Sequence, residues 1–172
     1  MSDQAILPAA YAAERWTDFG VGVAGASAAL AGLVFVAVSI NLSEILKYRN
    51  LPGRAGLTLI LFVTPLLVGI LLLVPGQVRA ALGGELIAAG VIIGGFELII
   101  NQRSGRSDQE TRLTWILARV FPPVASCGCL VLAGATLLAQ AGGGLYWLVP
   151  SVVVAIVFGL VNAWVLLVEI LR

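Results

Sequence analysis

Residues 20–42, GVGVAGASAALAGLVFVAVSINL, form an apolar run that contains no charged residue. A helix of about 20 such residues is long enough to cross the roughly 30 Å hydrocarbon core of a bilayer. Further runs of similar length follow at 57–75, 83–100, 116–140 and 145–169. The sequence therefore predicts an all-α fold, a polytopic membrane helix bundle with five transmembrane helices.

Basic residues are distributed unevenly between the segments that join these runs. If the N-terminus lies outside and the chain crosses five times, the outer segments hold only Arg15 and Arg79. The inner segments hold the remaining basic residues, which are Lys47, Arg49, Arg54, Arg103, Arg106, Arg112, Arg119 and Arg172. Because cytoplasmic segments are enriched in Lys and Arg, this division predicts an N-out, C-in topology.

The composition is that of a membrane protein with no attached soluble domain. Hydrophobic residues make up 60% of the chain and charged residues 11%, against about 25% charged in an ordinary soluble domain. We expect an outer interfacial tail at 1–19, with Trp16 at headgroup level, and a single transmembrane bundle at 20–172. The lipid bilayer is the expected partner, and the net charge of +1 gives no indication of nucleic-acid binding.

The first run is rich in small residues, and Ala24, Ala28 and Gly32 repeat every four positions along one helical face. In lipid, close backbone approach at small residues accounts for much of the association between helices. We therefore expect this helix to be the most tightly packed, against another helix of the same chain or against a second copy. Further packing positions are predicted at Gly90, Gly94, Ala155, Gly159 and Ala163.

Prolines and turn residues predict where the helices bend or end. Pro65 lies near the middle of the second run and predicts a kink. Residues 50–53, Asn-Leu-Pro-Gly, indicate a turn before that run. Ser107 followed by Glu110 indicates a helix start on the inner surface, and Pro122-Pro123 should bend that helix after it enters the membrane.

One acidic residue, Glu97, lies well inside an apolar run. A carboxylate in lipid is costly unless it is paired, so such residues face a bundle interior and are candidates for function. The topology predicts an inner-leaflet polar cluster of Ser39, Asn41, Glu97, Asn101, Arg119 and Asn162, with Glu169 at its rim. Three interpretations of Glu97 stay open: a structural pair with Arg119, a site for an ion, proton or lipid headgroup, and a side chain that reaches the interface.

Few residues of this chain suit an enzymatic reaction. The sequence contains no His, which removes the usual general base and a common metal ligand. Cys127 and Cys129 point in different directions on a predicted helix, so we expect free thiols. Residues 20–25 match GxGxxG but lack the preceding strand that a dinucleotide site needs. We therefore expect a protein that is not an enzyme and holds no cofactor or metal.

Residues 25–46, GASAALAGLVFVAVSINLSEIL, preceded by Trp16-Thr17-Asp18-Phe19, resemble the opening helix of a family of small bacterial integral membrane proteins. Some members of that family are described as modulators of the FtsH protease. The resemblance implies a bacterial plasma membrane and a partner role, and it carries over no catalytic residue. Residues 29–38 are also similar to the pore helix of Orai calcium channels but lack its acidic filter, which indicates a helix suited to close symmetric packing.

Together these features predict a non-enzymatic integral membrane protein that acts through intramembrane helix packing. In the leading hypothesis the chain forms a homo-oligomer that encloses a path for an ion or small solute. In the alternative it is an accessory subunit that modulates another membrane protein, such as a membrane protease or transporter. A polar-lined symmetry axis would favour the first hypothesis, whereas one exposed small-residue face is enough for the second.

Overall fold

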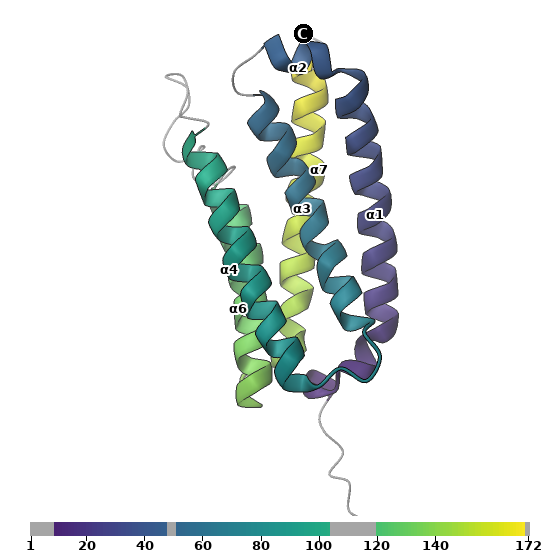
Figure 1. The fold of residues 1–172 in the computed structure, drawn as a ribbon, viewed down its shortest axis with the longest axis vertical. Coiled ribbons are helices and arrows are strands. Elements are labelled where there is room, and N and C mark those ends of the chain that lie inside the picture. The colour runs from purple at the N-terminus through teal and green to yellow at the C-terminus, as the bar shows by residue number, and fades with distance from the viewer. Residues whose placement is uncertain (1–8, 48–50, 104–119, 171–172) are drawn as a thin grey trace, which may run out of the picture.

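Five long helices lie side by side in the computed structural model, which describes residues 9–47, 51–103 and 120–170 (Figure 1). They are α1 (Thr17–Ile40), α3 (Leu51–Leu72), α4 (Arg79–Arg103), α6 (Phe121–Ala139) and α7 (Leu148–Ile170). Each is long and apolar enough to cross a membrane, and the described ranges contain no strand. The predicted all-α fold with five candidate membrane spans is confirmed.

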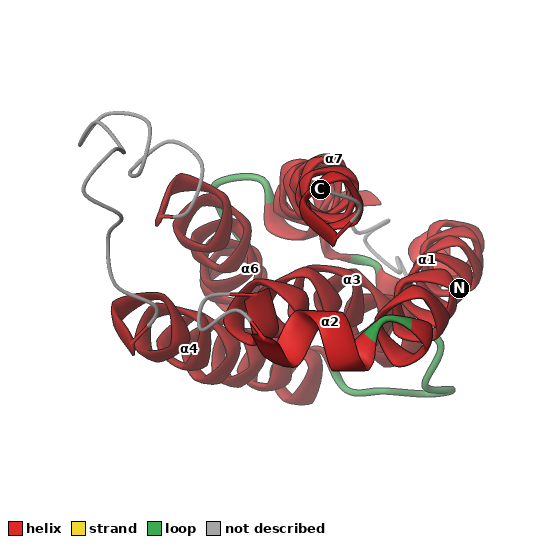
Figure 2. Ribbon diagram, turned by 90° about the horizontal axis from the view of Figure 1, so that it is seen from above, coloured by secondary structure: helices red, strands yellow, loops and turns green. Residues whose placement is uncertain are grey.

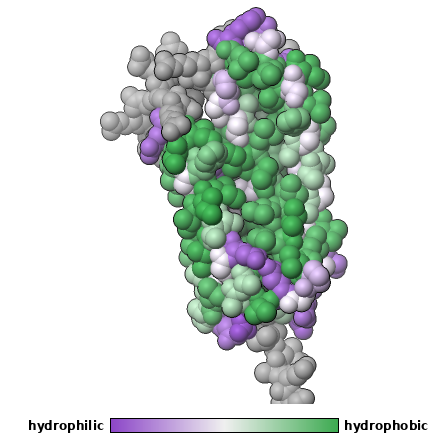
Figure 3. All heavy atoms as spheres, viewed as in Figure 1, coloured by the Kyte–Doolittle hydropathy of each residue, from purple (hydrophilic) through white to green (hydrophobic). Residues whose placement is uncertain are grey.

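The chain starts at one end of the bundle and finishes at the other, as an odd number of spans requires (Figure 1). We call the end where α1 begins the N-side and the end where α7 finishes the C-side. The short helix α2 (Leu42–Lys47) crosses the C-side. Three single helical turns, η1 (Ala9–Tyr11), η2 (Ala13–Trp16) and η4 (Gly144–Trp147), belong to the N-side. Apolar residues cover the middle of the face shown in Figure 3, and hydrophilic residues gather toward both ends, as a bilayer-spanning bundle requires.

The helices form two closely packed pairs joined by a fifth helix. α4 packs along α6, and α1 packs along α3. α7 contacts both α3 and α6 and so connects the two pairs. Seen from the C-side in Figure 2, α1 and α4 lie on opposite sides of α3. This separation decides which of the predicted polar residues can meet.

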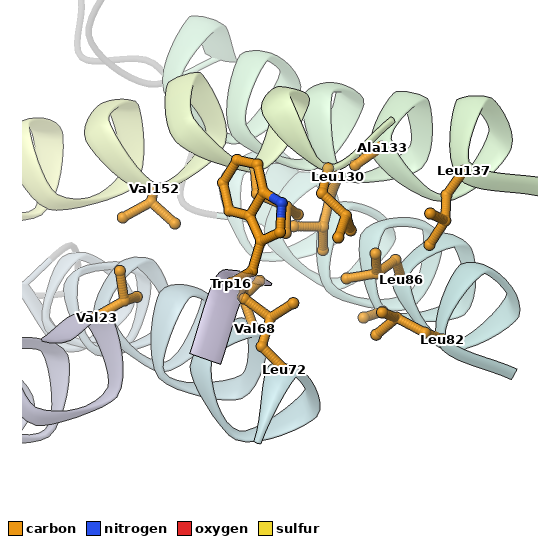
Figure 4. Packing of buried hydrophobic residues seen from close by; sticks show 13 residues of the cluster. Trp16, Val23, Val68, Leu72, Leu82, Leu86, Leu130, Ala133, Leu137 and Val152 are labelled. Atoms are coloured by element: carbon orange, nitrogen blue, oxygen red, sulfur yellow. The ribbon is translucent and has the colours of Figure 1, made fainter. Parts of the chain in front are cut away.

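Trp16 is part of the buried core at the N-side. Its side chain is 8% exposed, and its indole Nε1 donates a hydrogen bond to the Ala9 carbonyl at 2.8 Å. The ring also makes an edge-to-face contact with Tyr146, with ring centroids 5.1 Å apart. Figure 4 shows the indole pointing into the space between the helices, near Val152 and Val68. With its one polar group satisfied by the backbone, the ring can be buried; the expected headgroup level of Trp16 stays a prediction.

Three prolines expected to mark a turn or a bend lie in the first turns of helices as the structure describes them. α3 starts at Leu51, so Pro52 and Gly53 belong to its first turn and not to a preceding loop. Pro122 and Pro123 likewise occupy the first turn of α6. The first turn of a helix does not use its own N–H groups, so Pro is tolerated there. Pro65 lies inside α3 as predicted, and the helix expected to begin at Ser107 lies outside the described residues.

Candidate functional site

Glu97 lies on the side of α4 that faces the bundle interior. Its side chain is 1% exposed, and it continues the buried stripe that Leu82, Leu86 and Ala89 form nearer the N-side. The lipid-facing side of the same helix carries large apolar residues such as Phe96. This placement is the one expected for an acid within a membrane span, because the interior offers partners that lipid does not.

The Cys127 thiol of α6 donates a hydrogen bond to Glu97 Oε2, with sulfur and oxygen 3.5 Å apart. A thiol is a weak donor, so this contact offsets little of the cost of burying a charged carboxylate. Asn101, four residues further along α4 and so on the same side of the helix, is also buried, with 2% exposed. A buried acid and a thiol therefore form a small polar contact between α4 and α6, near the C-side.

Glycines bring α4 and α6 close enough for this contact. A Cβ added at Gly94 would lie 3.1 Å from Cys127 Cβ, and one at Gly90 would lie 2.9 Å from the Cys127 carbonyl oxygen. A Cβ at Gly134 would lie 2.5 Å from the Gly83 carbonyl oxygen on the N-side half of the same interface. The predicted packing positions Gly90 and Gly94 thus serve contact within one chain and hold the thiol against the acid.

The single polar cluster predicted across α1, α4 and α7 is wrong, because α1 lies on the far side of α3 from α4 (Figure 2). Ser39 is exposed and donates to the Phe35 carbonyl at 2.8 Å, and Asn41 Nδ2 donates to the Ala37 carbonyl at 2.9 Å. Both therefore satisfy carbonyls of the last turns of α1. Asn162 is half-buried on α7. Arg119 and the side chain of Glu169 lie outside the described residues, so the pairing of Arg119 with Glu97 stays a prediction.

The predicted packing positions on α1 and α7 have different surroundings. Ala24 packs on α3, where a Cβ at Gly69 would lie 2.8 Å from the Ala24 nitrogen. On α7, Ala155 is fully buried, and a Cβ added at Gly159 would lie 2.8 Å from the Phe62 ring. Ala163 lines an apolar groove between α1 and α7. Ala28 and Gly32, by contrast, are exposed.

Within one chain α1 is the least buried span. Only 11% of its apolar window is buried, against 50% for α3. The expectation that α1 is the most tightly packed helix is therefore wrong for the single chain, because its small residues point both toward α3 and away from the bundle. The expectation that α1 packs tightly against a second copy stays a prediction.

A pair of serines that the sequence analysis missed joins α6 to α7. Ser126 Oγ donates to the Ser151 carbonyl at 3.0 Å, and Ser151 Oγ donates to the Ser126 carbonyl at 2.8 Å. Both side chains are 1% exposed. A serine inside each apolar run was the available signal, but nothing in the sequence shows that the two face each other.

Cys127 and Cys129 are free thiols, and no group of three or more His, Cys, Asp or Glu side chains gathers within the described ranges. Comparison of the chain with protein-family models, with curated proteins and with solved structures gives no match.

Proposed function

We propose that this chain is a non-enzymatic integral membrane protein that acts through intramembrane helix packing and self-associates through α1. One observation carries the proposal: from Gly22 to Gly32 the outward face of α1 is built from small residues that the single chain does not use, whereas large apolar residues such as Leu33 and Phe35 are exposed beyond it. The exposed small residues are Gly22, Gly25, Ala26, Ala28, Ala29 and Gly32. A close-packed neighbouring helix is the partner that such a face suits best.

The glycines of this face are not required by the fold of one chain. A Cβ added at Gly22, Gly25 or Gly32 would meet no atom within 4 Å. Gly costs a helix about 1 kcal/mol relative to Ala, so exposed glycines weaken α1 unless something packs on them. The interior positions Gly69 and Gly134 differ, because an added Cβ there would collide with backbone.

Large residues make up most of the exposed face of α7 and the C-side half of the exposed face of α4. Ile92 and Phe96 on α4 are 69% and 57% exposed, and Trp164 on α7 is 71% exposed. Lipid tails pack well against such side chains, whereas small residues allow the backbones of two helices to approach closely. The contrast supports helix contact at α1 and lipid contact on α4 and α7.

The proposal includes an N-out, C-in topology in a bacterial plasma membrane, supported by the distribution of basic residues and by the resemblance of residues 25–46. In a homo-oligomer, an ion or small-solute path would run along the axis between the α1 helices. The same exposed face supports a second candidate: an accessory subunit that binds a membrane protease or transporter. The two candidates differ in whether the partner is a second copy of this chain.

Oligomer mass in mild detergent, measured by light scattering after size exclusion, tests the proposal. We expect a mass of two or more chains for the wild type and a smaller mass for Gly32→Leu, because Leu blocks close approach while the single chain has room for it. Gly128→Leu is the matched control, since Gly128 is exposed on α6 and also has open space. A monomeric wild type would overturn self-association and favour the accessory subunit. An oligomer unaffected by Gly32→Leu would show that α1 is not the interface.

A further inference from the structure

A groove of about 190 Å³ lies between α1 and α7, with α3 as its floor. Leu30 and Val34 of α1, Phe62 of α3, and Leu160 and Ala163 of α7 are among its lining residues, all of which are apolar. The groove lies within the membrane-spanning parts of these helices. An occupant of this groove must therefore be apolar.

The length of the groove along the helices matches the thickness of the hydrocarbon layer in one leaflet of a bilayer. Its lining runs from Leu30 to Val38 on α1 and from Leu160 to Leu167 on α7, which places it in the C-side half of both helices. At 1.5 Å per residue these stretches are roughly 12 Å long, close to half of the ~30 Å hydrocarbon core. A hydrocarbon chain anchored at the C-side surface would lie along this length.

Helix α2 closes the C-side end of the groove and carries charge to the membrane surface there. Val38 and Leu166, which line the groove, also pack against Ile45 of α2, which is 1% exposed. Lys47, at the end of α2, has a 63% exposed side chain. Its 2.6 Å ion pair with Glu44 is exposed, so the ammonium group lies at the surface of this end, where a basic side chain attracts anionic headgroups.

We propose that the groove binds one acyl chain of an anionic phospholipid from the C-side leaflet, with the headgroup over α2 near Lys47. The apolar lining takes the chain, and the basic side chains at this end of the bundle, Lys47 and Arg54 in the first turn of α3, attract the phosphate. A basic side chain near an anionic membrane surface contributes about 1 kcal/mol. None of the exposed small residues of α1 lines this groove, and the lipid site does not depend on self-association.

Native mass spectrometry of the full chain, purified with added phosphatidylglycerol or phosphatidylcholine, tests the site. We expect the wild type to retain one phosphatidylglycerol per chain in preference to phosphatidylcholine. Ala163→Phe should fill the groove and lose the retained lipid. Val157→Phe is the matched control, because Val157 lies on the same helix, is 49% exposed and does not line the groove; it should retain the lipid.

Lys47→Gln should keep a bound lipid but lose the preference for phosphatidylglycerol. Retention of lipid by Ala163→Phe at the wild-type level would overturn the groove as the binding site. An equal preference for the two lipids in the wild type would overturn the headgroup contact. Loss of oligomer mass in Ala163→Phe with no loss of lipid would show that a second chain occupies the groove. Circular dichroism of each variant checks that the helices are intact.

Discussion

Ser126 and Ser151 bond to each other's backbone in both directions: each hydroxyl donates to the other residue's carbonyl, at 3.0 Å and 2.8 Å. The two hydroxyl oxygens are themselves 3.3 Å apart. The arrangement buries two polar side chains between α6 and α7 with each donor satisfied. It fixes the position of α7 against α6, the helix that also presents Cys127 to Glu97.

Loss of either serine should weaken the bundle. We expect Ser126→Ala and Ser151→Ala each to lower the free energy of unfolding in detergent by about 0.5–1.5 kcal/mol, the usual contribution of one hydrogen bond. The double variant should lose more than either single variant, because each substitution removes only one donor. Ser39→Ala is the control, since the exposed Ser39 hydroxyl bonds only within α1. Unchanged stability in both single variants would contradict the prediction.

Two glycines on α6 should respond oppositely to substitution by Ala. At Gly134 the added Cβ would lie 3.1 Å from the Ile87 nitrogen and 2.5 Å from the Gly83 carbonyl oxygen. Backbone atoms cannot move aside cheaply, so Gly134→Ala should lower the free energy of unfolding by about 1–3 kcal/mol. At Gly128 nothing lies within 4 Å, so Ala should raise that energy by up to about 1 kcal/mol. Equal effects at both positions would refute the close approach of α4 and α6.

The N-out topology predicts which engineered cysteines an impermeant thiol reagent can reach. With Cys127 and Cys129 replaced by Ala, we expect Lys47→Cys to react only from the cytoplasmic side and Ala141→Cys only from outside. Ala141 is exposed on the N-side and is preferable to Gly143, where φ of 108° and the nearby Trp147 ring disfavour any side chain. Labelling of position 47 from outside intact cells would contradict the N-out topology.

A double-mutant cycle tests the pair predicted between Glu97 and Arg119. Removing one member of a buried ion pair leaves an uncompensated charge, which is costlier than removing both. We therefore expect Glu97→Gln and Arg119→Gln each to lower the thermal unfolding temperature in detergent. The double variant should recover part of the loss. Strictly additive effects would show that the two side chains do not interact, and would leave Cys127 as the only partner of Glu97 seen among the described residues.

The sequence alone identified Glu97 as the acid of the candidate site. Glu97 is conspicuous because an acid in an apolar run must face the bundle interior, and it does. Its contact with Cys127 was not predictable, because that depends on how far α6 is displaced along α4. That displacement follows from where Gly90, Gly94 and Gly134 allow backbones to touch, and small residues are too common in this chain to identify one register.

What the sequence by itself determined was the number of spans and the all-α fold, since lipid leaves each apolar run no alternative to a helix that satisfies its own backbone. It also placed Pro65 inside α3. Only the tertiary structure decided which helices are neighbours, and this separated Ser39 and Asn41 from Glu97. It also decided that Trp16 is buried and that the outer face of α1 is left open. The physical reason is that helix formation depends on local backbone bonds, whereas helix pairing depends on side-chain shape across residues distant in sequence.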